Sequence, residues 1–141
     1  MEREDLQWSL HLHGGVATLT LRGEWDERSE HVIAGVIERL IRSGHLEILV
    51  DVTRVEGLSP AQPVWLDSLE RIAGQVRAHR GYLDVISALP AVQQMIRARA
   101  GSALGWASSE EEALCHRLHL PVVTPGPRVA TRLVGSDGAA H

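Results

Sequence analysis

Residues 46–66 constrain the fold more than any other stretch, because they run from a buried strand through a loop to a helix start. Residues 48–52, Ile-Leu-Val-Asp-Val, form a short apolar run rich in β-branched residues, typical of a strand covered on both faces. Ser59, Pro60 and Gln62 match the cap, first position and third position of a helix. Such a helix start presents free N–H groups at the carboxyl edge of a sheet, where α/β proteins usually build their sites. We therefore expect function at this loop.

Hydrophobic periodicity predicts alternating strands and helices on both sides of this stretch. Residues 8–13 and 16–22 alternate apolar and polar side chains on either side of two glycines. This pattern predicts a hairpin with one solvent-exposed face. The remaining predicted elements are a helix over 29–43, the strand after residue 46, a helix from 60 or 63 to 79, a strand over 82–87, a helix over 90–101, an extended segment at 104–106 and a helix over 109–118. This order predicts a mostly parallel sheet with right-handed crossovers after the hairpin.

Two helices have apolar stripes that should face the core. Gly44 should end the first helix, and Ser109 with Glu112 forms a capping box for the last one. The predicted buried stripes are Val32, Ile33, Val36, Ile37, Leu40 and Ile41 in the first helix, and Trp65, Leu69, Ile72, Ala73 and Val76 in the second.

Size, charge and cysteine content limit the class of protein. The chain has 141 residues, which predicts one domain over residues 1–120 and a flexible tail over 121–141, where proline, glycine, alanine and serine accumulate. The net charge is −4 and the charges are mixed along the chain, so we expect no nucleic-acid binding. No apolar run approaches the roughly 20 residues of a membrane span. Cys115 is the single cysteine and the first residues lack a signal peptide, so we expect a cytoplasmic protein.

Several short motifs occur in a fixed order along the chain. They are Gly23-Glu24-Trp25-Asp26, the run 48–52 with Val55, Arg80-Gly81 before a strand ending in Ser87, Pro90-Ala91-Val92, Gly101 and Ser108 to Leu114. Together they resemble the STAS domain, the fold of anti-sigma factor antagonists. The resemblance covers about residues 8–118 in one order. It implies an α/β fold with a mixed, mostly parallel sheet of four to five strands, an N-terminal hairpin and about four helices. It also implies a bacterial regulator of transcription that binds an anti-sigma factor or related kinase.

The same resemblance places the partner-binding surface at the loop before the second helix. The residues expected there are Trp25, Asp26, Thr53, Arg54, Glu56, Ser59 and Gln62. In this family a serine of the loop is phosphorylated, which breaks the complex with the kinase. Here Pro60 and Ala61 stand in place of the two serines. Ser59 is the remaining hydroxyl that could accept a phosphate, although its position favours a plain helix cap.

Other chemistry has weaker support in the sequence. His11 with His13, and His116 with His119, could each supply two metal ligands, but no third ligand accompanies either pair at zinc-like spacing. Cys115 falls within a predicted helix and reads as a small buried residue. No phosphate loop, nucleophile elbow or paired carboxylates are present, so we expect neither an enzyme nor a cofactor.

Three functions therefore stay open. The first is an anti-sigma factor antagonist, and the second is a scaffold or accessory subunit of a signalling assembly or a lipid-transporter ATPase. The third is a sensor of a small ligand or nucleotide at the helix start. The oligomeric state, including a homodimer, is also open.

Overall fold

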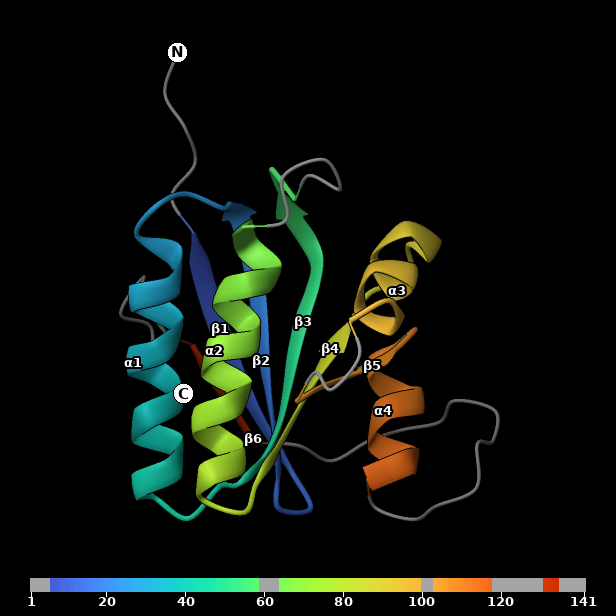
Figure 1. The fold of residues 1–141 in the computed structure, drawn as a ribbon. Coiled ribbons are helices and arrows are strands. Elements are labelled where there is room, and N and C mark those ends of the chain that lie inside the picture. The colour runs from blue at the N-terminus through green and yellow to red at the C-terminus, as the bar shows by residue number, and fades with distance from the viewer. Residues whose placement is uncertain (1–5, 59–63, 100–102, 118–130, 135–141) are drawn as a thin grey trace.

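The computed structural model of the chain describes residues 6–58, 64–99, 103–117 and 131–134. The described elements are β1 (Gln7–His13), β2 (Val16–Glu24), α1 (Ser29–Arg42), β3 (Glu47–Glu56), α2 (Val64–Ala78), β4 (Tyr82–Ile86), α3 (Pro90–Arg97), β5 (Leu104–Ala107), α4 (Glu110–Arg117) and β6 (Thr131–Val134) (Figure 1). The predicted hairpin and the alternation of strands and helices after it are confirmed. The expected solvent-exposed face of the hairpin is not, because Thr18 of β2 is buried and Ser9 and His11 of β1 are half-buried.

The strands form one mixed sheet in the order β5-β4-β3-β2-β1-β6. Strands β2, β3, β4 and β5 run parallel to one another, while β1 pairs antiparallel with both β2 and β6. The predicted α/β fold with an N-terminal hairpin and a mostly parallel sheet is therefore confirmed. The parallel strands place their carboxyl ends at one edge of the sheet, which we call the carboxyl edge, and their first residues at the opposite, amino edge.

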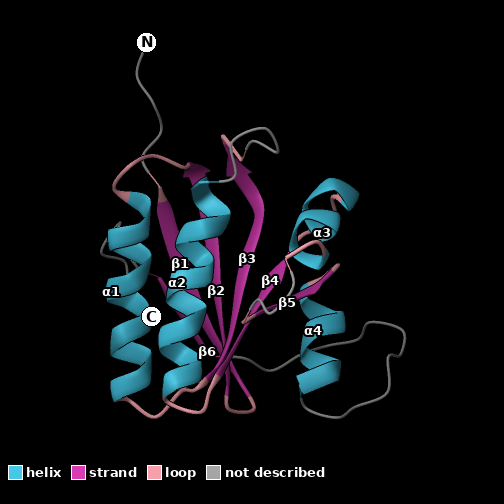
Figure 2. Cartoon of the chain, viewed as in Figure 1, coloured by secondary structure: helices cyan, strands magenta, loops and turns pink. Residues whose placement is uncertain are grey.

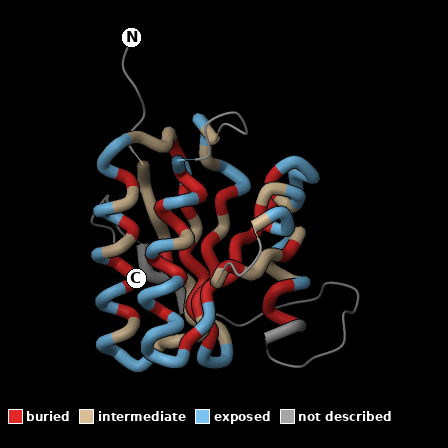
Figure 3. Tube along the Cα trace, viewed as in Figure 1, coloured by how far each residue is buried: buried red, intermediate tan, exposed pale blue. Residues whose placement is uncertain are grey.

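Helices cover both faces of the sheet (Figure 2). Helices α1 and α2 lie side by side on one face, and α4 lies on the other (Figure 1). The larger apolar core fills the space between the sheet and helices α1, α2 and α3. Figure 3 shows the buried segments of the strands that form the sheet side of this core. A smaller core under α4 consists of Val16, Leu49, Ile86, Ala107, Ala113 and Leu114. The alternation of strand side chains supplies both cores, as expected for strands covered on two faces.

The predicted stripe of α2 is confirmed, because all five of its residues are buried and Trp65 is only 2% exposed. The stripe of α1 is confirmed in part. Val32 is 38% exposed and Ile41 is half-buried, whereas the other four residues are buried. Helical spacing places Val32 at the margin of the stripe, and the neighbouring elements do not cover it. The regular part of α2 begins at Val64, directly after Pro63. The proposed capping residue Ser59 lies outside the described residues.

Two chain turns are set by glycine. Gly44 has a φ of +83° and follows the end of α1, where the His45 N–H donates to Leu40 O at 2.8 Å, so the predicted helix stop is confirmed. At Gly81 the backbone passes so close to its neighbours that a Cβ would lie 2.4 Å from Leu46 O. A side chain at this position would displace the start of β3 or β4.

The start of α4 shows the predicted cap in an altered form. The Glu112 N–H donates to Ser109 Oγ at 3.1 Å, as a capping residue requires. The Glu112 carboxylate, however, accepts a hydrogen bond from Ser108 Oγ. The cap is therefore confirmed, but the side chain of Glu112 binds the preceding hydroxyl.

Strand β6 was not predicted. It extends the sheet beyond β1, with Leu10 opposite Leu133 in the register, and it lies within the segment predicted to be a tail. Because β6 has only four residues, its sequence carries little periodic signal. The boundary at residue 120 stays a prediction. In the described ranges, no helix is both long enough and apolar enough to cross a bilayer.

Candidate functional site

The carboxyl ends of β2 and β3 are joined at the edge where the sequence predicted a site. The two strands pair in parallel up to Glu24 opposite Glu56. Directly after β2, the Trp25 N–H donates to Glu56 O at 3.0 Å. This backbone hydrogen bond brings Trp25 next to Glu56 at the end of β3, so two predicted segments that are far apart in sequence form one surface.

Strand β3 contains an irregularity just before this edge. Thr20 pairs with Asp51, but Arg22 pairs with Arg54, so β3 has one more residue than β2 between these pairs. Such a bulge bends the strand and redirects side chains. At the bulge, the Thr53 N–H donates to Asp51 Oδ1 at 2.9 Å. Thr53 therefore lies within β3, at this bulge, and not in the loop before α2 where it was expected.

Asp26 organises the turn that leads into α1. Its Oδ1 accepts hydrogen bonds from the Arg28 N–H at 2.8 Å and from Ser29 Oγ at 3.3 Å, while its own N–H donates to Ser29 Oγ at 2.8 Å. The residue that caps α1 is Arg28, which makes no side-chain cap hydrogen bond. Asp26 therefore does not cap α1. Its carboxylate closes the turn that precedes the helix.

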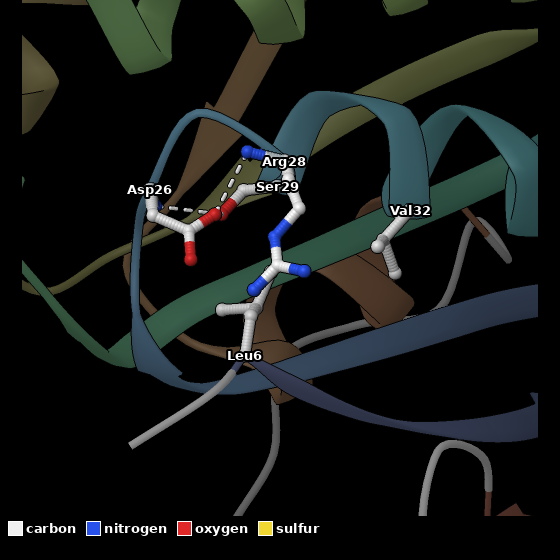
Figure 4. A pocket seen from close by; sticks show the side chains of 5 residues that line it. All are labelled: Leu6, Asp26, Arg28, Ser29 and Val32. Carbon is white, nitrogen blue, oxygen red and sulfur yellow. Dashed lines mark hydrogen bonds between the residues drawn. The ribbon is translucent and has the colours of Figure 1, made fainter. Parts of the chain in front are cut away.

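A pocket of about 210 Å³ opens beside this turn and is lined by Leu6, Asp26, Arg28, Ser29 and Val32 (Figure 4). The Arg28 guanidinium extends toward Leu6 across the pocket (Figure 4). In the part of the chain that the structure describes, this guanidinium has no hydrogen bond or ion pair, so its charge is available to a partner. Sequence reasoning missed this pocket, although the position of Val32 at the margin of its stripe was a usable signal.

The remaining predicted residues differ in exposure. Thr53, Arg54 and Glu56 are exposed, whereas Trp25 is half-buried and packs against the larger core. Ser59 and Gln62 lie outside the described residues, so their roles stay predictions. Sequence reasoning missed Val64, which begins α2 and is 62% exposed. Its location off the apolar stripe was the signal that could have identified it.

A hydrogen-bonded cluster joins the first turn of α1 to the second and third turns of α2. Glu30 accepts hydrogen bonds from Ser68 Oγ at 2.7 Å and from Arg71 at 2.9 Å and 2.5 Å. The Arg71 hydrogen bonds, followed by that of Ser68, lower the pKa of Glu30 from 4.5 to about 2. The cluster ties α1 to α2 through one carboxylate, one hydroxyl and one guanidinium.

The other candidate groups form no chemical site in the described residues. His11 Nδ1 lies 3.9 Å from a Glu110 carboxylate oxygen on α4, and Cys115 is buried. His119 lies outside the described residues. Throughout the described ranges, no three His, Cys, Asp or Glu side chains gather closely enough to hold a metal ion.

No protein-family model matches the chain, and no curated protein matches it in sequence. Solved structures do match. An anti-sigma factor antagonist from Mycobacterium paratuberculosis has a TM-score of 0.62 at 19% identity, and the match covers 79% of this chain and 93% of that one. The anti-sigma factor antagonist SpoIIAA in its unphosphorylated form has a TM-score of 0.56 at 18% identity, over 79% of this chain and 97% of that one.

A third match is a putative anti-sigma factor antagonist from Thermotoga maritima, with a TM-score of 0.53 at 13% identity, over 76% of this chain and 91% of that one. Each of the three matches covers nearly the whole chain of the solved structure. The chain therefore has the STAS fold of these anti-sigma factor antagonists, as the sequence motifs predicted. Below 25% identity the likeness establishes the fold and leaves the function to be argued from the site.

Proposed function

We propose that this chain is a non-catalytic STAS regulator that binds a protein partner through the carboxyl-edge surface, defined as Trp25, Asp26, Arg28, Thr53, Arg54, Glu56 and Val64. The partner we propose is an anti-sigma factor or a related kinase. One observation carries the proposal: the hydrogen bond from the Trp25 N–H to Glu56 O joins the two predicted segments at one edge. The shared fold with anti-sigma factor antagonists supports the choice of partner.

The composition of the surface suits protein binding. Val64 is exposed, and Trp25 is anchored in the core while keeping part of its side chain at the surface. Arginine and tryptophan are enriched among residues that dominate binding energy, and this surface includes Trp25, Arg28 and Arg54. The Asp26 turn and the Glu30 cluster fix the backbone beneath it, so little ordering entropy is lost on binding.

We propose further that binding is independent of phosphorylation. The loop carries Pro60 and Ala61 where the antagonists' serines are expected, so the usual acceptor is absent. Without an acceptor, the abundance of the chain controls the complex, because a phosphate charge cannot be added there to repel the partner.

The test is calorimetric titration of the purified chain with an anti-sigma kinase encoded in the same genome. Arg54→Glu should weaken binding by on the order of tenfold to a hundredfold, because it reverses a charge at the surface. Arg77→Glu is the matched control, since Arg77 is exposed in the last turn of α2 at the opposite edge. Equal binding by both variants would contradict the proposed surface.

The missing acceptor also favours the second function, a scaffold or accessory subunit, because scaffolding requires only a binding surface. Analytical ultracentrifugation distinguishes the two proposals. A monomer or dimer that forms a complex with the kinase supports the antagonist role. A large homo-assembly, or purification together with a transporter ATPase, supports the scaffold.

A further inference from the structure

A second concave surface lies between β1 and α1, away from the carboxyl-edge surface. This groove has a volume of about 190 Å³. Its floor is apolar and is formed by Trp8, Leu10 and Leu12 of β1 with Val36 and Leu40 of α1. These are the side chains on the face of β1 that packs against the larger core. An apolar cavity of about 150 Å³ accommodates a molecule the size of benzene, so this groove has room for an aliphatic chain of about eight carbons.

The polar lining of the groove comes from Arg39, Ser43 and His45. Arg39 and Ser43 are one helical turn apart at the end of α1, and His45 follows Gly44 on the way to β3. Within the described part of the chain, none of these three side chains has a hydrogen bond or ion pair. In contrast, the neighbouring Arg42 is paired with Glu38 at 2.7 Å. The groove therefore has an unpaired positive charge and two further hydrogen-bonding groups beside an apolar floor.

The topology separates the polar and apolar parts of the groove along its length. Strand β1 and helix α1 both run toward the amino edge, so Ser43, His45 and Leu12 lie near that edge and Trp8 lies at the far end. A ligand that matches this arrangement has an anionic head at the amino edge and an unbranched chain directed toward Trp8. The planar guanidinium of Arg39 is suited to a carboxylate, which it can bind through two parallel hydrogen bonds.

We propose that the groove between β1 and α1 binds a medium-chain aliphatic carboxylate, with its head group at Arg39, Ser43 and His45 and its chain along Trp8, Leu10 and Val36. The apolar floor offers no polar group to recognise a base or sugar, so nucleotides do not fit. The site lies on a different part of the surface from the partner-binding residues. The inference therefore stands or falls independently of the proposed function.

The test uses sodium octanoate and isothermal titration calorimetry on the full chain. A ligand of this size should bind with a Kd on the order of 1 mM. Affinity should rise about fourfold with each added methylene from butanoate to octanoate and level off beyond about eight carbons, when the groove is filled. In parallel, the indole N–H resonance of Trp8 should shift on titration, while that of the fully buried Trp65 stays unchanged.

Variants separate head-group recognition from non-specific apolar binding. Arg39→Gln should weaken octanoate binding about tenfold, because it removes a charged hydrogen bond. Arg77→Gln should have no effect, since Arg77 is also exposed but lies at the end of α2. 1-Octanol should bind the unmodified chain about as weakly as octanoate binds the Arg39→Gln variant.

Three results would overturn the proposal. The first is no heat and no Trp8 shift at roughly ten times the expected Kd. The second is equal affinity for octanoate and 1-octanol, or for the two arginine variants, which would indicate non-specific apolar binding. The third is a homodimer that excludes octanoate and protects the Trp8 indole, which would show that a second copy covers the groove.

Discussion

Protonation of Glu30 should destabilise the chain in acid, because this carboxylate joins α1 to α2 through Ser68 and Arg71. Its pKa in the folded chain is lowered from 4.5 to about 2, mainly by the Arg71 hydrogen bonds and then by that of Ser68. In a shielded site this difference would correspond to about 3.4 kcal/mol. The Glu30 side chain is 35% exposed, so solvent screening reduces the expected contribution to about 1 kcal/mol.

The direction of the pH dependence follows from the lowered pKa of Glu30. The folded state holds the charged carboxylate more tightly than the unfolded state does, so the stabilisation is complete above the unfolded value of 4.5. It disappears as the pH falls through about 2. Urea denaturation of the unmodified chain and Glu30→Gln should therefore show a difference of about 1 kcal/mol at neutral pH that narrows below about pH 4.5 and closes near pH 2.

The matched control for this experiment is Glu38→Gln. Glu38 pairs with Arg42 one turn away in α1, and both side chains are largely exposed. Removing this pair should cost only about 0.3–0.5 kcal/mol. A Glu30→Gln difference that is independent of pH would refute the reasoning, as would a Glu38→Gln loss of equal size. Either result would mean that the α1–α2 cluster has no special strength.

Three further outcomes follow from the described contacts. Gly81→Ala should destabilise the chain by about 2 kcal/mol or more in urea denaturation, because its Cβ would lie 2.4 Å from Leu46 O. The control Gly74→Ala has open space around its Cβ and should be neutral or gain up to about 1 kcal/mol of stability. Equal effects of the two substitutions would contradict this. Ser109→Ala should cost about 1 kcal/mol by removing the cap of α4, measured the same way, and an unchanged unfolding midpoint would show that the cap contributes nothing. Mass spectrometry after incubation with kinase and ATP should find no phosphate in residues 59–63, and a phosphate on Ser59 would restore the switch that Pro60 and Ala61 argue against.

The order of elements could be predicted because it depends on local periodicity. The run at residues 48–52 marked a strand covered on two faces, and the spacing from Trp65 to Val76 marked the buried side of a helix. Both predictions depend on which side chains must leave water, which the sequence states directly. The run at 48–52, together with the short motifs from Gly23 to Leu114, indicated the STAS fold, which the solved structures confirm.

Features that depend on contacts between distant segments were not predictable in the same way. The bulge near Thr53 is defined by its register against β2, and strand β6 is defined by its pairing with β1. The role of Asp26 depends on the hydroxyl of Ser29, which can be assigned only when the turn geometry is known. The groove between β1 and α1 is likewise a product of packing, because its floor residues have the same periodicity as ordinary core residues.

The most direct test of the partner-binding surface is amide hydrogen exchange of the chain, measured alone and in complex with the anti-sigma kinase. The proposal predicts new protection in residues 24–28, at the end of β3 and at the start of α2, with no change at the ends of α1 and α2 near Arg42 and Arg77. Protection confined to the amino edge, or no complex with the kinase while the chain remains folded, would contradict it.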